Sequence, residues 1–259
     1  MKKFLILMAT AAFLLSCGTC RYASNGPRRL TLMTYNVGAF SKYMDNSTGE
    51  VAQLIAGSGA SYVALNELDS CNRRHATYQL ADLAAQLGDW SYQFASAFPY
   101  AGGGYGNGVV TPDEVIKGYS LILPKGDGSE QRSVAVVETA DCVFASVHLD
   151  HKGQTAALEQ MAVVNEWFTT HYADYAKPVF LCGDFNVTPD SDVIELAEGC
   201  WIQLSGNGFT HSTTNPRHCI DYIFALKVAV PVKVLESAVL TEGTAELSDH
   251  FPVIVTVEY

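Results

Sequence analysis

The sequence is poor in basic residues and has no long apolar run beyond its N-terminus. Its 259 residues include 16 lysines and arginines against 27 acidic residues, which gives a formal net charge of −11. Affinity for long nucleic acids comes mainly from basic side chains that neutralise phosphates, so this balance disfavours a protein that grips DNA or RNA. It suits a site that recruits divalent cations. Because no later apolar run is long enough to cross a bilayer, we expect the body of the chain not to span a membrane.

The N-terminus has the pattern of an export signal. Lys2 and Lys3 precede the apolar segment 4–15, and Ser16-Cys17 follows it. This order predicts a signal peptide over residues 1–16, and its end resembles a bacterial lipobox in which Cys17 becomes lipidated. An ordinary secretory signal cleaved nearby is the alternative. We expect a flexible tether over residues 17–29 and an exported, membrane-anchored lipoprotein of the bacterial cell envelope.

Cysteine pairs with the spacing of a zinc or redox site are absent once the tether residues are set aside. In an oxidising compartment a disulfide is plausible, and Cys200 with Cys219 is the weakly favoured pair. Cys142 and Cys182 stand in apolar, strand-like runs that are typical of core positions.

The spacing of apolar residues predicts strands and helices around two sheets. Strand-like runs end near residues 36 and 67, and helical patterns follow over 50–56 and 78–87. A long helix is predicted over 155–172, and further strands over 92–98, 108–110, 119–123, 133–138, 143–149, 179–182, 219–224, 232–239 and 251–257. We therefore expect one α/β domain over residues 30–259. Its predicted fold is a four-layer α/β sandwich of two packed, mixed, mostly antiparallel sheets with helices on the outside.

Polar side chains stand at the ends of several apolar runs. The sharpest case is Gly183-Asp184-Phe185-Asn186, which delivers a carboxylate and an amide to a sheet edge. The same pattern holds for Asn36, Glu67, His148 and the pair Asp249-His250. The shared rhythm of strand and helix in the two halves would bring these residues to one edge of the sandwich. The pattern therefore predicts a functional site.

These residue types suit phosphate-ester cleavage, which requires a Lewis acid, an activated water and stabilisation of the leaving oxygen. Mg²⁺ prefers oxygen ligands and needs only one or two carboxylates with amides and waters. Glu67, Asn36 and Asp249 form such a ligand set. Asp184 is then available to hold or deprotonate water, and His148 and His250 can donate to phosphate oxygens.

Structural explanations exist for the same residues. Asn36 fits a turn before Gly38, His148 fits a satisfied core histidine, and Asp249-His250 fits a cap. Glu67 is harder to explain in this way, because an unpaired buried carboxylate is costly. Their joint occurrence favours a function.

Other polar groups carry weaker patterns. The glycine-rich segment 101–108 is followed by no helix-opening phosphate-binding motif, so a flexible loop is the simpler interpretation. Arg73-Arg74 could meet a substrate phosphate or be solvated charges. Histidines without ligand spacing, expected at the surface, are His75, His151, His171, His211 and His218. His151 could be an exception because it closely follows His148.

Six motifs in order resemble the endonuclease/exonuclease/phosphatase superfamily of metal-dependent phosphoesterases. They are Thr-Tyr-Asn-Val, Asn-Glu-Leu-Asp, Ser-Val-His-Leu, Gly-Asp-Phe-Asn, Ile-Asp-Tyr-Ile and Ser-Asp-His-Phe-Pro, and the resemblance covers essentially residues 30–259. It implies that Glu67 is the principal metal ligand, with Asn36 beside it and Asp249 in support of the metal and the nucleophile. Asn66 departs from the glutamine that many members carry before the glutamate.

The resemblance also implies roles for the remaining motif residues. Asp184 would position or deprotonate the attacking water, and Asn186 would hold the phosphate in line. His148 would contact the scissile phosphate, and Asp221 would orient His250. A Tyr-Gly-Asn segment near the substrate in the family makes Asn107 a secondary substrate-binding candidate.

Together these patterns predict an exported phosphoesterase that depends on Mg²⁺ or Mn²⁺ and acts by in-line attack of water. Its acidity favours a small phosphorylated molecule or a lipid headgroup over nucleic acid, and we expect a monomer. A secreted DNA or RNA nuclease is the first alternative. A binding lipoprotein that kept the fold without catalysis is the second.

Overall fold

The computed structural model describes residues 26–259, so the predicted signal peptide, Cys17 and most of the tether lie outside the described residues. Two six-stranded sheets form the centre of the described chain. The first contains β1 (Arg29–Asn36), β2 (Tyr62–Ser70), β3 (Ser91–Tyr100), β4 (Gly103–Thr111), β11 (Lys233–Val239) and β12 (Val253–Glu258). The second contains β5 (Lys117–Ile122), β6 (Ser133–Glu138), β7 (Val143–His148), β8 (Val179–Asp184), β9 (Trp201–Gln203) and β10 (Asp221–Leu226).

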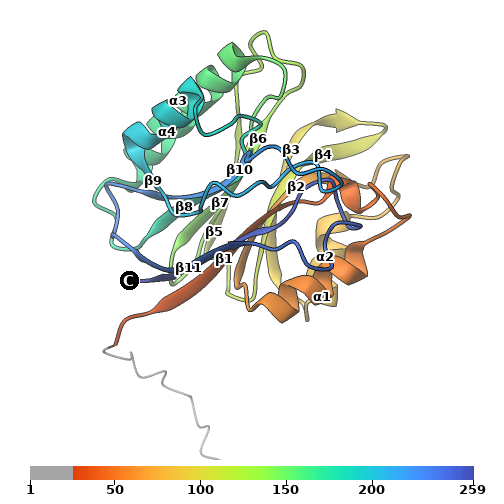
Figure 1. Ribbon diagram of the computed structural model, residues 1–259, viewed down its shortest axis with the longest axis horizontal. Helices are drawn as coiled ribbons and strands as arrows, with labels where there is room; N and C mark the ends of the chain where they lie inside the picture. The colour runs from red at the N-terminus through yellow and green to blue at the C-terminus, as the bar shows by residue number, and fades with distance from the viewer. Residues whose placement is uncertain (1–25) are drawn as a thin grey trace, which may run out of the picture.

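Helices cover the outer faces of the two sheets. α1 (Thr48–Ser58) and α2 (Gln79–Gln86) lie on one side of the molecule, and α3 (Gln154–Tyr172) and α4 (Asp192–Cys200) on the other (Figure 1). A short 3-10 helix, η1 (Gly38–Phe40), follows β1. Separate apolar clusters join each helix pair to its sheet, and a third cluster joins the two sheets. The predicted α/β sandwich of mixed sheets is therefore confirmed.

Each sheet has one parallel pair at its centre, and these two pairs position the polar strand ends. The sheet orders are β11-β12-β1-β2-β4-β3 and β5-β6-β7-β8-β10-β9, and the pairs other than β1–β2 and β7–β8 are antiparallel. Asn36 lies opposite Asn66 in the first pair, and His148 lies opposite Asp184 in the second. Since parallel strands end at the same sheet edge, both pairs deliver polar side chains there.

The observed elements differ from the prediction in a few places. β2 continues past Glu67 to Ser70, and most of the glycine-rich segment belongs to β4 instead of a flexible loop. Close packing of neighbouring strands favours glycine in this segment. A Cβ atom at Gly106, for example, would lie 2.0 Å from the Ala95 carbonyl oxygen. The pattern also missed α4, although Ser191 caps it by accepting a hydrogen bond from the Ile194 amide.

The favoured disulfide is wrong, because the five cysteines within residues 26–259 are all free thiols. In the same part of the chain, no helix combines the length and the apolar character needed to cross a bilayer.

Candidate active site

The predicted site residues of both sheets converge on the carboxylate of Asp184 at the end of β8. Its Oδ2 accepts a hydrogen bond of 3.0 Å from Nδ2 of Asn36, which lies in the other sheet. The Nε2 atoms of His148 and His250 lie 3.5 and 3.6 Å from the same oxygen. The backbone amide of Asn186 donates to Oδ1 at 2.8 Å. Asp184 is thus a buried carboxylate surrounded by donors, as the convergence of strand ends predicted.

Glu67 lies at a break in the regular pairing of β2. The register between β2 and β4 shifts between Leu65 and Leu68, and Glu67 has a φ of 60°. A non-glycine residue rarely adopts this conformation, so the bulge re-aims the side chain at the cost of local strain. The amide of Asn36 donates to Oε1 of Glu67 at 3.1 Å. Asn36 therefore connects the predicted metal ligand to the predicted water-positioning carboxylate.

The ammonium group of Lys42 lies beside a carboxylate that the sequence predicts to bind a metal. Nζ of Lys42, in the loop after η1, is 2.5 Å from Oδ2 of Asp249. Burial acts to lower the pKa of Lys42, but the hydrogen bond and charge of Asp249 and the charge of Glu67 raise it above its ordinary value. Both carboxylates therefore act on one ammonium group, and a divalent cation can take the same place. The carbonyl and carboxylate oxygens of Asn36, Glu67 and Asp249 are of the kind that hard divalent cations prefer, and binding of an ion by these residues stays a prediction.

A second group of possible ligands overlaps this centre. Asp184, Asp221 and His250 are buried, and one ligand atom of each lies within 4.8 Å of the others. This trio can hold a metal ion, yet its internal contacts are those of an oriented histidine. Nδ1 of His250 is 2.9 Å from Oδ2 of Asp221, which can only accept, so Nδ1 carries a proton. The remaining nitrogen faces Asp184.

Buried charges shift the protonation of this trio. Burial acts to lower the pKa of His250, but the charges of Asp221 and Asp184 raise it to about 10. Burial is the main cause that raises the pKa of Asp184 to about 7, and the charge of Asp221 adds to it while His250 acts against it. A base that operates near neutral pH needs a pKa in this range. His250 is then an imidazolium that stabilises negative charge.

Arg132, a residue that the sequence patterns did not indicate, keeps His148 neutral, in contrast to the charged His250. NH1 of Arg132 lies 3.3 Å from Nδ1 of His148. A guanidinium can only donate, so Nδ1 accepts and the proton of a neutral ring stays on Nε2, which faces Asp184. Burial, followed by the charge of Arg132, lowers the pKa of His148 well below its ordinary value. His148 is therefore a neutral donor with a fixed tautomer.

Asparagine side chains hold the two sheets and the strand ends together. Asn66 Nδ2 donates to the Val147 carbonyl at 2.9 Å, and its Oδ1 accepts from the Asp184 amide at 3.0 Å. Asn107 Nδ2 donates to the carbonyl oxygens of Ser133 and Ser146. Asn186 Nδ2 donates to the Leu149 carbonyl at 3.0 Å. The substrate contacts of Asn107 and Asn186 stay predictions, since these amides already connect backbone segments.

Two histidines expected at the surface lie against other groups instead. The His211 ring is 4.7 Å from that of His250 between centroids, and its Nε2 is 4.0 Å from Oδ2 of Asp249. His75 Nδ1 lies 2.5 Å from Oδ2 of the buried Asp69. Neither could be found from spacing, because their partners are in other elements.

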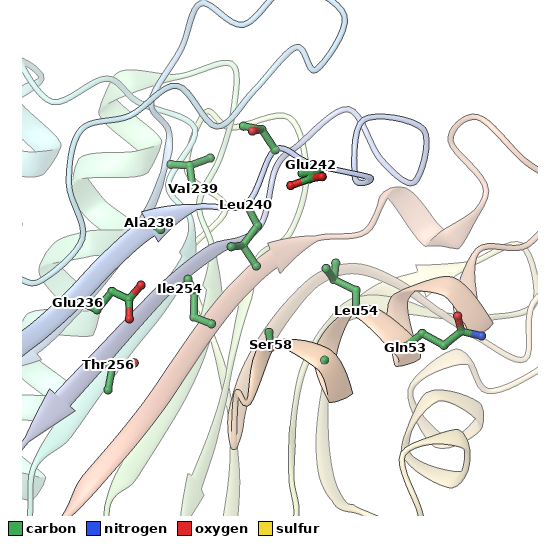
Figure 2. A pocket seen from close by; sticks show the side chains of 12 residues that line it. Gln53, Leu54, Ser58, Glu236, Ala238, Val239, Leu240, Glu242, Ile254 and Thr256 are labelled. Carbon is green, nitrogen blue, oxygen red and sulfur yellow. The ribbon is translucent and has the colours of Figure 1, made fainter.

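The groove in Figure 2 is separate from this site. Residues of α1, β11, β12 and the segment after β11 line its 570 Å³, and the residues described above are not among them. Its lining mixes aliphatic side chains with neutral polar ones, and Glu236 and Glu242 are its charged members.

Comparisons with known proteins agree with this geometry. A protein from Bacteroides thetaiotaomicron, described as of the endonuclease/exonuclease/phosphatase family, superposes with a TM-score of 0.73 at 20% identity, covering 90% of this chain and 99% of that one. The mannosyl-6-phosphatase of the same species gives 0.73 at 20% identity over 89% and 100%. D. rerio TDP2, in complex with a single-strand DNA product, gives 0.68 at 18% identity over 88% and 98%. These similarities show the fold.

A search of curated proteins finds no match. The sequence profile of the endonuclease/exonuclease/phosphatase family, in contrast, matches residues 33–250. This match spans the strand-end residues from Asn36 to His250. The chain therefore belongs to the endonuclease/exonuclease/phosphatase family.

Proposed function

We propose that this protein is an exported, metal-dependent phosphoesterase that hydrolyses a small phosphorylated molecule or a lipid headgroup. The observation that carries the proposal is the convergence of Asn36, His148 and His250 on one oxygen of Asp184, beside the carboxylates of Glu67 and Asp249. This arrangement combines a base, hydrogen-bond donors and oxygen ligands for a cation, which are the elements that hydrolysis of a phosphate ester requires.

The chain's own residues divide the chemistry as follows. Asp184, once ionised, holds the attacking water and accepts its proton. The Nε2 N–H groups of His148 and His250 point toward Asp184 Oδ2 and can donate to a phosphate oxygen that binds beside this carboxylate. Glu67, Asn36 and Asp249 would hold a divalent cation, which would supply Lewis-acid charge for a phosphate oxygen. Lys42 would compete with such a cation for Asp249, since its ammonium group already contacts Oδ2 of this carboxylate.

Net charge and a protein of similar fold support the proposed substrate class. A chain with a net charge of −11 disfavours long phosphate polymers. The mannosyl-6-phosphatase shows that this fold accommodates a phosphatase of small esters. We place the protein in the cell envelope, anchored through lipid on Cys17. A Cys17→Ser variant should then move from the membrane fraction to the soluble fraction of the expressing bacterium.

A hydrolysis panel tests the proposal. Hexose phosphates, inositol phosphates, sphingomyelin, bis-p-nitrophenyl phosphate and plasmid DNA are incubated with Mg²⁺, Mn²⁺ or EDTA. We expect turnover of a small ester that EDTA abolishes. Asp184→Asn should lower kcat by about 10²- to 10⁴-fold, the usual contribution of a general base. Asp190→Asn, an exposed carboxylate outside the donor cluster, is the matched control. Activity that survives EDTA, or equal activity in Asp184→Asn, contradicts the mechanism.

A further inference from the structure

A small pocket beside the candidate site contains three aromatic rings and two opposite charges. Arg74, Phe98, Tyr100, Tyr105 and Glu130 line its volume of about 120 Å³, and we call it the aromatic pocket. The proposed catalytic steps use none of these side chains, although Arg74 and the segment that begins at Tyr105 carried weaker sequence patterns. The volume is well below the 300 Å³ or so at which typical ligand pockets begin, so it suits a single ring.

The register of the first sheet builds the floor of this pocket. Tyr105 of β4 lies opposite Asp69 of β2 on one side and opposite Phe98 of β3 on the other. Residues paired across neighbouring strands share a face of the sheet, so the three side chains form one row. Phe98, Tyr100 and Tyr105 pack together with ring centroids 5.3 to 6.2 Å apart. Tyr100 precedes the hairpin turn between β3 and β4 and remains 37% exposed.

Arg74 is fixed over the aromatic rings. Its Nε and NH2 donate to Oδ2 and Oδ1 of Asp69 at 2.7 and 2.9 Å, and Asp69 is fully buried. Burial acts to raise the pKa of Asp69, but the hydrogen bonds from Arg74 and His75 hold it below its ordinary value. The guanidinium lies 4.8 Å from the centroid of the Tyr100 ring. Its NH1 has no hydrogen-bond partner in the described chain, so two donors remain for a ligand.

The aromatic pocket adjoins the candidate site on two sides. Asp69 is two residues beyond Glu67 on β2, and the charges of Glu67 and Arg132 both reach the hydroxyl of Tyr105. Glu130 lies 3.5 Å from Arg132, whose NH1 contacts His148. The pocket is thus linked through Arg132 to the predicted phosphate donor His148, and its partner Asp69 lies on the same strand as the predicted metal ligand Glu67.

We propose that the aromatic pocket binds the alcohol part of the substrate and that this part is a hydroxylated ring, as in a monosaccharide phosphate. This inference rests on the proposed phosphoesterase function. Sugar hydroxyls accept hydrogen bonds from a guanidinium and donate them to a carboxylate. Arg74 supplies the guanidinium and Glu130 supplies the carboxylate. The C–H faces of the ring pack against the aromatic side chains. An acyclic headgroup offers no such face.

A nucleobase could use the same aromatic rings by stacking. In a polynucleotide, however, neighbouring phosphates would lie close to the Glu130 carboxylate, and no lysine lines the pocket to offset them. The charges of the pocket therefore favour a neutral polyol ring over a nucleotide.

Steady-state kinetics on Tyr100→Ala test the subsite. The probes are glucose, mannose and galactose 6-phosphates, with glycerol 3-phosphate as the acyclic comparison and AMP as the nucleotide. We expect KM for the best hexose phosphate to rise about fivefold to tenfold, the usual worth of one aromatic contact, while kcat and the kinetics of glycerol 3-phosphate stay within about twofold. Tyr100→Phe keeps the ring and should behave as the wild type. Tyr92→Ala removes a similarly exposed tyrosine of the same strand that does not line the pocket.

Equal shifts of KM for the cyclic and acyclic esters, or a preference for AMP, overturn the subsite. If the wild type hydrolyses none of these esters, the wider hydrolysis panel above decides the proposed function, and titration calorimetry with the same hexose phosphates decides the subsite. Binding that weakens about fivefold to tenfold in Tyr100→Ala supports it. Absent binding, or binding unchanged in Tyr100→Ala, rejects it.

Discussion

At the scale of single residues, the two histidines that flank Asp184 differ in protonation because their second ring nitrogens meet opposite charges. His250 faces the carboxylate of Asp221, which stabilises the imidazolium. His148 faces the guanidinium of Arg132, whose positive charge disfavours protonation of the His148 ring. One carboxylate is therefore approached by one charged and one neutral donor. With this asymmetry, the charged His250 can stabilise an anion while Asp184, our proposed base, keeps a pKa of about 7.

The pH dependence of hydrolysis follows from these shifts. Burial raises the pKa of Asp184 to about 7, and only the ionised form can accept a proton from water. We expect kcat/KM to fall as the pH drops through 7, and no alkaline limb below about pH 9, because the pKa of His250 is raised to about 10. Stopped assays from pH 5 to 9 with saturating Mg²⁺ measure this. A flat profile between pH 5 and 8 would falsify the assignment of Asp184 as the base.

Arg132 should matter for activity although it does not approach the predicted metal ligands. In Arg132→Met the tautomer of His148 is no longer fixed, so its proton can move to Nδ1 and leave Nε2 without a donor. We expect kcat to fall at least about tenfold, the lower bound for removing a partner that orients a functional histidine. Nitrogen NMR of the His148 ring should show a loss of the Nε2–H form. Wild-type kcat together with an unchanged tautomer would contradict this role.

Sequence reasoning found the strand-end residues and missed the cations around them, for a physical reason. Asn36, Glu67, His148 and Asp184 interrupt apolar runs, so each is visible locally. Lys42 and Arg132 lie in segments without periodicity, and Asp249 and His148, which they contact, belong to other segments of the chain. Only their proximity to the site in the folded structure makes Lys42 and Arg132 functional candidates. A single sequence does not show that proximity.

At the scale of elements, long periodic segments were predictable and short ones were not. The strand over 133–138 was predicted with the bounds of β6, and the helix over 155–172 begins one residue after α3 does. β9 has only three residues, and the bulge that places Glu67 depends on pairing with β4. Pairing partners decide such details, so the local pattern could not predict them.

Asp150 organises two elements next to the site. Its Oδ2 accepts from the Ser129 amide and hydroxyl, and its Oδ1 accepts from the amides of Lys152 and Gly153 before α3. Although burial acts to raise its pKa, these hydrogen bonds lower it to about 2. The carboxylate therefore ties the loop that carries Glu130 to the start of α3.

Removing this carboxylate should destabilise the fold. Asp150→Ala leaves several buried donors unsatisfied, and we expect the free energy of unfolding to fall by about 3 kcal/mol in urea titrations at pH 7. The folded-state pKa is depressed, so the contribution is present above the ordinary aspartate pKa and disappears as the pH falls toward 2. The difference between wild type and Asp150→Ala should shrink over that range. A constant difference down to pH 2.5 would show that the charge of Asp150 is not responsible. Asp190→Ala, an exposed carboxylate in the loop before α4, is the control.

At the scale of the whole molecule, net charge distinguishes the two candidate substrate classes, which are small phosphate esters and nucleic acids. A protein that neutralises several phosphates with lysine and arginine gains affinity through counterion release, and this chain has 27 acidic residues against 16 basic ones. Each of three basic groups at the site already has a carboxylate partner that offsets its charge, with Arg74 on Asp69, Arg132 on Glu130 and Lys42 on Asp249. Little positive charge is therefore available for a phosphate backbone.

This charge balance predicts weak binding to DNA even where the catalytic groups are intact. With Asp184→Asn to prevent cleavage, we expect a fluorescent 20-base-pair duplex to show no anisotropy change below about 100 µM protein at 150 mM NaCl, the weak limit of non-specific binding. Lowering the salt should recover little affinity, because few phosphate contacts release counterions. A low-micromolar Kd with a steep salt dependence would instead indicate a basic groove and favour the nuclease alternative. The wild-type enzyme provides the matching functional comparison, in which turnover of the best small ester should exceed plasmid nicking under the same Mg²⁺ and salt.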